Sequence, residues 1–428
     1  MEIVILVLAF LILIGIGVPV AWSIGLSSIM TMLVSVPAIP AFTTVAQRIA
    51  TGIDSFALLA IPFFVLAGEI MNRGGIARRL IDFAKSIVGA LPGGLAHVNI
   101  TAAMLFGAIA GSAAAAASAI GGFMGDAMEK EGYDKDFAAA VNITSATTGL
   151  VIPPSNVLIV YSLASGGISI GALFVAGYIP GMLTGLLLMG VAAIWAKKKG
   201  YPVGERTSIS NLASSFLKAF PSLLLLIVVI GGIVVGIFTA TEASAVAVLY
   251  CLILTFIYKE VSMNDLPRIF LNSVGTTAIV MLLIGTSMSM SWILAYENIP
   301  QNITDLLLGL SDNKVVILIL INAILLFVGI FMDITPAVLI FTPIFLPVVT
   351  EIGISPVHFG IIMVLNLCIG LCTPPVGSLL FIGVGVAGTS IQKVVKPLIP
   401  LFIAMIIALI IITYVPALSL WLPSLFGY

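Results

Sequence analysis

Two short segments of this chain carry residues that could bind an ion. Residues 149–154 read Gly-Leu-Val-Ile-Pro-Pro, and residues 370–375 read Gly-Leu-Cys-Thr-Pro-Pro, at an offset of 221 residues. Proline removes a backbone donor and obstructs the preceding helical turn, so each Pro-Pro pair predicts a broken helix with unpaired carbonyl oxygens at membrane depth. Hard oxygen ligands of this kind suit Na⁺ better than a transition metal.

Oxygen-bearing residues close to the two breaks are the candidates for a joint cation and solute site. Broken helices that face hairpin turns offer carbonyl oxygens at their C-termini to a cation and N–H donors at their N-termini to an anion. The predicted Na⁺ ligands are Ser112, Thr147, Gly149, Ile152, Pro153, Asp333, Thr335, Gly370 and Thr373. The predicted solute contacts are Ser112, Ser155, Asn366 and Gly377.

Asp333 is the most informative single residue, because an acid inside a membrane segment is costly and suggests function. We expect it to balance a bound cation or to carry a proton. The alternative is a structural cap, since Asp333 and Thr335 precede Pro336 in a turn, and an Asp there can accept bonds from the first N–H groups of the next helix. Glu69 and Glu242 are weaker candidates, because both are expected near helix ends.

The composition is that of an all-α polytopic membrane protein. The 428 residues are 61% hydrophobic and 8% charged, and the mean hydropathy is +1.27, far from the balance of a soluble domain. The net charge of -1, without a basic run interleaved with aromatic residues, argues against a nucleic-acid partner. Because no Walker loop or HExxH motif occurs, we expect no enzyme activity, no cofactor and no metal other than Na⁺.

The first half, residues 1–199, is predicted to hold five crossings and one re-entrant hairpin. The hairpin covers about 95–127 with its turn at 111–112, because each arm is shorter than the about 20 residues that a spanning helix needs. The alternative is one crossing helix whose Gly107 and Gly111 form a packing face. The other expected elements are helices at about 3–20 and 22–36, a polar connection with Arg48 and Asp54, a helix at 56–72, an interfacial amphipathic helix at 76–88, a broken helix at 137–165 and a helix at 168–196.

A polar cytoplasmic linker, residues 200–220, precedes the second half, residues 221–428, which repeats the plan. The offset of 221 residues aligns Gly15 with Gly236, residues 111–112 with 332–333, and the two Pro-Pro pairs, which indicates an internal repeat. The expected elements are helices at about 222–239, 242–258 and 274–295, an interfacial stretch at 300–310, a hairpin at 315–350, a broken helix at 357–388 and a helix at 397–420.

The basic residues favour inverted repeats. An odd number of crossings in the first half makes the second half start from the opposite side of the membrane. With both termini outside, the cytoplasmic loops hold every Lys and Arg except Arg48 and Lys314, as the positive-inside rule asks. Treating both hairpins as full crossings would move Lys259, Arg268 and Lys393 outside, so the hairpin interpretation is favoured.

Six motifs spread over the chain point to one family of membrane proteins. They are residues 15–21 (GIGVPVA), 61–69 (IPFFVLAGE), 149–155 (GLVIPPS), 236–243 (GIFTATEA), 329–333 (GIFMD) and 370–377 (GLCTPPVG). Together they resemble the large membrane (M) subunits of tripartite ATP-independent periplasmic (TRAP) transporters. Ala240 departs from the proline of the family's Phe-Thr-Pro-Thr-Glu pattern, which affects no predicted site residue.

The resemblance implies an elevator-type, Na⁺-coupled importer in the bacterial inner membrane, with both termini periplasmic. Its solute would be a small organic acid, such as a C4-dicarboxylate, sialic acid or another sugar acid, delivered by a periplasmic solute-binding protein. Hairpins and broken helices would move as one body against a scaffold of the other helices. Because the chain starts directly at the first repeat, we expect the family's small four-helix membrane subunit to be a separate chain.

The sequence leaves three other interpretations of the function open. The first is a passive channel, in which the broken helices form a static filter. The second is a different Na⁺-coupled carboxylate carrier that works without a binding protein. The third is an intramembrane enzyme that uses Asp126 and Asp333 as a pair of acids.

Overall fold

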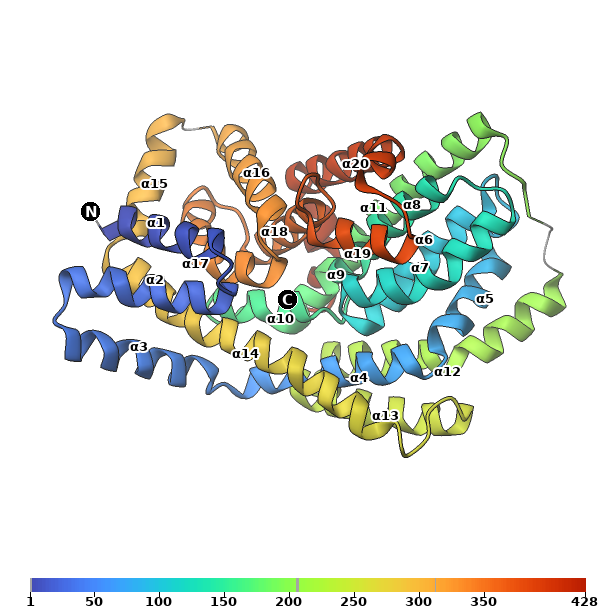
Figure 1. Cartoon of the computed structure of the whole chain (residues 1–428), viewed down its shortest axis with the longest axis horizontal. Helices are drawn as coiled ribbons and strands as arrows, with labels where there is room; N and C mark the ends of the chain where they lie inside the picture. Colours follow the sequence, from blue (N-terminus) through green and yellow to red (C-terminus); the bar gives the residue numbers. More distant parts are fainter. Residues whose placement is uncertain (1, 205–207, 312) are drawn as a thin grey trace.

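The computed structural model describes residues 2–204, 208–311 and 313–428, and these ranges fold into helices (Figure 1). Their one recorded β interaction is an isolated bridge between Pro92 and Val203. The predicted all-α class is thus confirmed for the described ranges. Residues 205–207 of the predicted linker, and Met1 of the first half, lie outside the described residues.

The first half alternates long apolar helices with short ones. Its elements are α1 (Glu2–Gly15), α2 (Val20–Ser35), α3 (Ala38–Ile53), the 3-10 helix η1 (Phe56–Leu59), α4 (Ala60–Arg73), α5 (Ile76–Val88), α6 (Gly94–Ala110), α7 (Ala113–Lys130), α8 (Lys135–Ala146), α9 (Thr148–Val151), α10 (Asn156–Ala164) and α11 (Ile170–Lys199). The amphipathic α5 buries Ile76, Leu80 and Ala84 and exposes Arg78, as its sequence pattern predicts.

The second half has a similar order of elements. They are α12 (Ile209–Val234), α13 (Ala240–Tyr258), α14 (Leu266–Tyr296), α15 (Ile299–Leu310), α16 (Lys314–Phe331), α17 (Ile334–Glu351), α18 (Pro356–Leu371), α19 (Ser378–Ala387), α20 (Ile391–Tyr414) and α21 (Ala417–Leu425). In each half a pair of helices meets at a two-residue turn, at 111–112 between α6 and α7 and at 332–333 between α16 and α17.

The prediction of a polar connection around Arg48 is wrong, because residues 38–53 form the helix α3. The polar residues of this segment do not interrupt the helix, since they lie on its exposed side. Thr43, Gln47 and Arg48 are exposed, whereas Ala41 and Val45 are buried in a cluster with Ile293 of α14. An amphipathic period explains the segment better than its overall polarity.

The predicted linker is also too long, because α12 begins at Ile209 and Pro221 lies inside it. Ser208 starts this helix as its N-cap, where its hydroxyl accepts a hydrogen bond from the backbone N–H of Asn211 at 3.2 Å. The polar part of α12 is therefore an exposed helical extension of an apolar helix. Helix α11 ends at Lys199 and α12 begins at Ile209, which leaves a shorter connection than predicted.

Within the described ranges, eight helices are long and apolar enough to cross a membrane, or nine if α8 to α10 count as one span bent by 50°. The chain is therefore a multi-pass membrane protein. Both α16 and α17 pass this length test, whereas α1 and α2 are shorter, at 14 and 16 residues. The length of a helix alone does not distinguish a membrane crossing from one arm of a hairpin. The count of five crossings in each half therefore stays a prediction.

Two groups of helices lie side by side in the fold. The helices α2, α3, α4, α13 and α14 pack together along one side of the molecule, at the lower edge of Figure 1, and we call this first group the scaffold. The hairpin helices and broken helices, α6 to α10 and α16 to α19, form the second group, which we call the central group. The scaffold helices α4 and α14 contact this central group through α6, α7, α10 and α17.

A left-handed glycine precedes the second helix of each half. Gly17, with φ of +87°, precedes α2, and Gly236, with φ of +79°, precedes α13. Glycine suits both positions because other residues rarely adopt positive φ. Gly17 and Gly236 thus have similar backbone conformations, and the alignment of Gly236 with Gly15 by the constant offset stays a prediction. The inverted relation of the halves stays a prediction.

Removing the cap of α13 should destabilise the fold measurably. Thr239 and Glu242 form a capping box, in which Thr239 Oγ1 accepts from the Glu242 N–H at 3.2 Å and Glu242 Oε2 accepts from the Thr239 N–H at 2.8 Å. Thr239→Ala should lower the free energy of unfolding by about 1 kcal/mol. Thr43→Ala, which removes an exposed hydroxyl bonded to Ile39 O inside α3, is the matched control. Equal losses of thermal stability in detergent would contradict this role of the cap.

Candidate functional site

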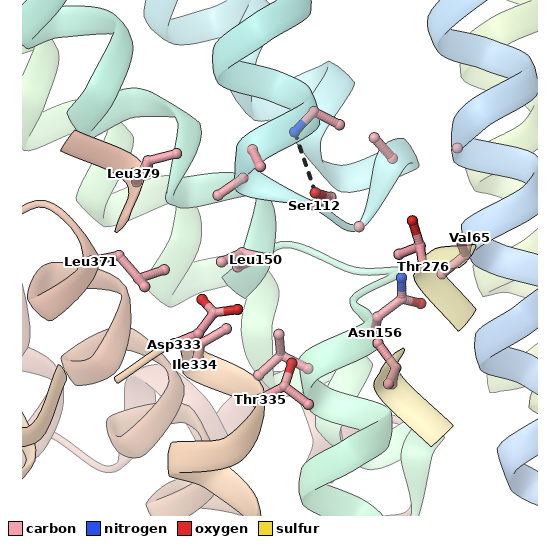
Figure 2. A pocket seen from close by; sticks show the side chains of 18 of the residues that line it. Val65, Ser112, Leu150, Asn156, Thr276, Asp333, Ile334, Thr335, Leu371 and Leu379 are labelled. Atoms are coloured by element: carbon pink, nitrogen blue, oxygen red, sulfur yellow. Dashed lines mark hydrogen bonds between the residues drawn. The ribbon is translucent and has the colours of Figure 1, made fainter. Parts of the chain in front are cut away.

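A cavity of about 500 Å³ lies where the turns of both hairpins meet the two broken helices (Figure 2). Helices α4 and α14 of the scaffold line its other side. The polar residues on its wall are Glu69, Asn72, Ser112, Ser118, Asn156, Thr276, Asp333, Thr335 and Ser378. Two halves of the chain, far apart in sequence, therefore share one polar cavity.

Helix ends of both kinds converge on this cavity. Four helices place their first turn on the wall, namely α7, α10, α17 and α19, through Ala113, Asn156, Ile334 and Ser378. Three helices place their last turn there, namely α6, α9 and α18, through Ala110, Leu150 and Leu371. Helix N-termini present free N–H donors and partial positive charge, and helix C-termini present carbonyl oxygens and partial negative charge. The cavity can thus attract an anion and a cation together.

The two hairpin turns differ in what their capping residues do. Gly111 ends α6 in the left-handed conformation, and Ser112 begins α7 with its Oγ accepting from the Ala115 N–H at 3.3 Å. Asp333 begins α17 without a side-chain capping bond. Figure 2 shows Ser112 and Asp333 approaching the cavity from opposite sides. The capping alternative for Asp333 therefore lacks the side-chain bond that a cap makes, and its role in cation binding stays a prediction.

Both Pro-Pro segments interrupt their helices in the same place relative to the cavity. The first follows α9, and the second follows α18; the peptide bonds Pro153-Pro154 and Pro374-Pro375 are both cis. Hydroxyl groups bond to carbonyls beside both breaks, since Ser155 donates to Leu150 O at 2.5 Å and Thr373 donates to Ile369 O at 2.8 Å, where the Cys372 N–H also donates. Backbone breaks in the membrane interior need such partners.

Two glycine pairs bring each broken helix against its hairpin. A Cβ atom on Gly149 would lie 2.3 Å from the Cα of Gly107 in α6, and one on Gly370 would lie 2.5 Å from the Cα of Gly329 in α16. No side chain fits such a backbone-to-backbone approach. The same close contact therefore recurs in both halves, and it sets the distance between the turn and the break.

Three of the predicted site residues lie on the cavity wall, namely Ser112, Asp333 and Thr335. Most of the others belong to the two breaks and adjoin the lining residues Leu150, Asn156, Leu371 and Ser378 without lining the cavity themselves. These are Thr147, Gly149, Ile152, Pro153, Ser155, Gly370, Thr373 and Gly377. Their roles as ligands or solute contacts stay predictions.

Asn366 lies away from the cavity wall, buried in α18. Its Nδ2 donates to the carbonyl oxygen and to Oδ1 of Asn322 in α16, at 3.0 and 2.7 Å. Asn322 in turn donates to Thr413 Oγ1 in α20 at 3.3 Å. The structure thus gives Asn366 a role in joining three helices, while its predicted contact with the solute stays a prediction.

Several cavity residues were missed by the sequence analysis. Asn156 directly follows the first break, and the Oδ1 atom of its amide is buried without a partner in the described part of the chain. Its position directly after Pro-Pro-Ser in the sequence could have identified it as a residue of the site. Asn72 and Thr276 come from scaffold helices, and no local pattern marks them, because only the packing of α4 and α14 brings them to the cavity.

The ionisable side chains on the described cavity wall are acidic. Glu69 and Asp333 line the cavity, and none of its described lining residues is Lys, Arg or His. An organic anion would therefore meet helix N-termini and amide or hydroxyl groups, but no cationic side chain. A cation bound at the carbonyl-rich helix ends would supply the missing positive charge.

The remaining acids named from the sequence lie elsewhere. Glu242 is used by the capping box of α13. Asp126 lines a separate cavity of about 250 Å³ with Glu129, Lys135 and Asn142, between α7, α8 and the end of α19. Because Asp126 and Asp333 do not share a cavity, the structure does not assemble the pair of acids that an intramembrane enzyme would need.

Comparison with known proteins gives consistent results. A family model described as "Tripartite ATP-independent periplasmic transporter, DctM component" matches residues 7–418. The uncharacterized protein YgiK of Salmonella typhimurium is 56% identical over 426 residues, covering 100% of this chain and 98% of that protein.

Two relatives with named solutes are about equally similar. The C4-dicarboxylate TRAP transporter large permease protein DctM of Rhodobacter capsulatus is 38% identical and covers 96% of each chain. The sialic acid TRAP transporter large permease protein SiaM of Vibrio cholerae is 41% identical and covers 90% of each. Among solved structures, the Alcanivorax borkumensis YdaH transporter has a TM-score of 0.62 at 13% identity, covering 90% of this chain and 88% of that one, which shows a shared fold.

Filling the glycine contacts should disturb the cavity. Gly149→Ala and Gly370→Ala each place a methyl group against backbone atoms, and we expect each to cost about 1–3 kcal/mol in folding free energy. Gly190→Ala in α11 is the control, because a Cβ there meets nothing within 4 Å, and it should be neutral or stabilising. Thermal unfolding in detergent measures all three. Wild-type stability of both Gly149→Ala and Gly370→Ala would show that the close approach is not required.

Proposed function

The chain belongs to the DctM family of tripartite ATP-independent periplasmic transporters, whose members are membrane permeases and not enzymes, and from this premise we propose that it is the translocating subunit of a Na⁺-coupled importer for a small organic acid. Transport by this family depends on a solute-binding protein. The coupling ion, the solute class and the movement are the parts that we propose for this chain.

Na⁺ coupling is supported by one observation above all. Helix ends of both polarities converge on a cavity whose described wall carries two carboxylates and no cationic side chain. An anionic solute would be repelled by Glu69 and Asp333 unless a cation entered with it. Binding of the cation would then raise the affinity for the solute, which is the thermodynamic basis of symport.

Two cation positions follow from the two breaks. In the first half the ligands would be Ser112 at the hairpin turn and carbonyl oxygens of the 147–153 segment. In the second half they would be Asp333, Thr335, Thr373 and the carbonyl oxygen of Gly370. Both sets consist of hard oxygen ligands, which suit Na⁺. No separate cofactor takes part in the proposal.

An elevator movement is supported by the position of the cavity between two groups of helices. The hairpins and broken helices supply one wall, and α4 and α14 supply the other. Gly68 of α4 lies so close to the hairpin turn that a Cβ there would be 2.9 Å from the carbonyl oxygen of Ala110. A small residue at this contact would let the central group slide along the scaffold.

The assembly we propose has three components. A periplasmic binding protein delivers the solute, and a small four-helix membrane subunit accompanies this one in the bacterial inner membrane. Both termini would be periplasmic, because this orientation places nearly all basic residues in the cytoplasm. The solute would be a C4-dicarboxylate, sialic acid or another sugar acid, since relatives of similar identity carry different solute names.

Reconstitution tests this function. The chain, its small subunit and the cognate binding protein are placed in proteoliposomes, and uptake of organic acids from the proposed classes is measured. An inward Na⁺ gradient should drive accumulation above equilibrium, and replacement of Na⁺ by K⁺ should abolish it. Equilibration without dependence on Na⁺ would indicate a passive channel. Na⁺-driven uptake without the binding protein would indicate a different type of carboxylate carrier.

Substitutions at the two hairpin turns should weaken the response to Na⁺. Asp333→Ala and Ser112→Ala each remove a proposed ligand, so the Na⁺ concentration for half-maximal uptake should rise by about tenfold, equivalent to about 1.4 kcal/mol. Ser118→Ala is the control, since this hydroxyl lines the same cavity but belongs to neither proposed ligand set. Association with the small subunit, measured by gel filtration, should persist. Unchanged Na⁺ activation in both turn variants would refute the assignment.

A cross-link between scaffold and hairpin should stop transport. Gly68→Cys with Ala110→Cys joins α4 to the first hairpin turn, where the two backbones are in contact. Gly25→Cys with Thr286→Cys is the control pair within the scaffold, because a Cβ on Gly25 would lie 3.7 Å from the Cβ of Thr286. Oxidation should abolish uptake only in the first pair, and reductant should restore it. Wild-type uptake by the oxidised first pair would contradict relative movement of the two groups.

A further inference from the structure

A third polar pocket, of about 330 Å³, is separate from both cavities described above and is rich in lysine. It forms where α8 begins, α11 ends and α20 begins. Lys198 and Lys199 come from the last turn of α11, and Lys393 and Lys396 come from the first turns of α20. Segments nearly 200 residues apart, from about 198 to 393, thus place four ammonium groups around one pocket.

The two carboxylates of this pocket already have partners. Asp134 pairs with Lys199 at 3.3 Å and accepts from the hydroxyl of Tyr201 at 3.1 Å. Asp136 accepts a short hydrogen bond from the hydroxyl of Thr389. Within the described ranges no ion pair joins Lys198, Lys393 or Lys396 to an acid. The pocket therefore has an excess of positive charge that the protein itself does not neutralise.

The indole of Trp195 lies on the same wall. Trp195 lines the pocket and is held against Phe137, with ring centroids 5.6 Å apart and ring planes 2° from parallel. Its Nε1 atom is buried and makes no hydrogen bond of normal geometry in the described structure, although it interacts with the side chain of Tyr201. The indole N–H can therefore donate to a ligand bound beside the lysines, while the excess positive charge of the lysines carries the inference.

The surroundings favour a lipid over a soluble anion. Ile194, one turn before Lys198 in α11, is 70% exposed, and Ile399, one turn after Lys396 in α20, is 52% exposed. Apolar side chains exposed directly beside the lysines suit acyl chains below a charged head group. Basic pockets between membrane helices on the cytoplasmic side are suited to anionic lipid head groups.

We infer that this pocket binds the phosphate head group of an anionic phospholipid from the cytoplasmic leaflet. The phosphate would accept from the lysine ammonium groups and from the indole N–H of Trp195, and the acyl chains would lie against α11 and α20. The lipid would join these two helices to the start of α8. This inference rests on the proposed orientation, which places the pocket on the cytoplasmic side, and not on Na⁺ coupling or on the identity of the solute.

Lipid retention tests the inference. The purified chain in phosphatidylcholine-containing micelles is titrated with phosphatidylglycerol, and bound lipid is counted by native mass spectrometry. Lys393→Gln with Lys396→Gln should weaken binding of one phosphatidylglycerol by about tenfold or more. The control, Lys130→Gln with Lys197→Gln, changes the charge equally at two exposed lysines that do not line the pocket, and it should bind as the wild type does. Lys393→Arg with Lys396→Arg keeps the charge and should retain the lipid.

Two results would overturn the inference. The first is equal retention of phosphatidylglycerol by the wild type and by the Lys393→Gln, Lys396→Gln variant. The second is displacement of the lipid by millimolar inorganic phosphate, which would assign the pocket to a soluble anion. Thermal unfolding without phosphatidylglycerol is measured beside each titration. If the glutamine variant is unstable, Trp195→Phe, which removes the N–H but keeps the stacked ring, provides the second measurement, and unchanged lipid binding there would argue against the pocket.

Discussion

Backbone groups that lose their helical partners inside a membrane must find others, and this constraint organises the whole structure. The prolines at 153–154 and 374–375 end helices where no bulk water is available, so their freed carbonyl and N–H groups need partners from hydroxyls, neighbouring helices or bound ligands. The two hairpins place further helix ends at the same level. The result is one cavity on which helix termini of both polarities converge.

The chain holds these ends at a fixed distance through glycine rather than through specific side-chain contacts. Gly107 against Gly149 and Gly329 against Gly370 bring backbones together in the same way in each half. The halves then differ at the turn, where Ser112 is used as a helix cap and Asp333 is not. Among the described residues that line the cavity, Asp333 is the one acid outside α4, and it lies in the second half, so the two proposed cation positions are chemically unequal.

The sequence predicted the features that depend on local chemistry and missed those that depend on packing. Adjacent prolines located both breaks, and short arms around residues 111–112 located the first turn. Residues 38–53 were misjudged because overall polarity was given more weight than amphipathic period. Asn366 was placed in the site by its type, although packing gives it Asn322 as a partner. Thr276 could not be found, because it reaches the cavity from a scaffold helix whose position no local pattern encodes.

The central claim is that these helix ends bind Na⁺ and that an anionic solute depends on it. The most direct measurement is the binding of radioactive sodium to the purified chain in detergent, with K⁺ as competitor and ionic strength held constant. The account predicts saturable Na⁺ binding that equimolar K⁺ does not displace and that tightens when the transported acid is added. No saturable binding, or solute binding of equal affinity in Na⁺ and K⁺, would contradict it.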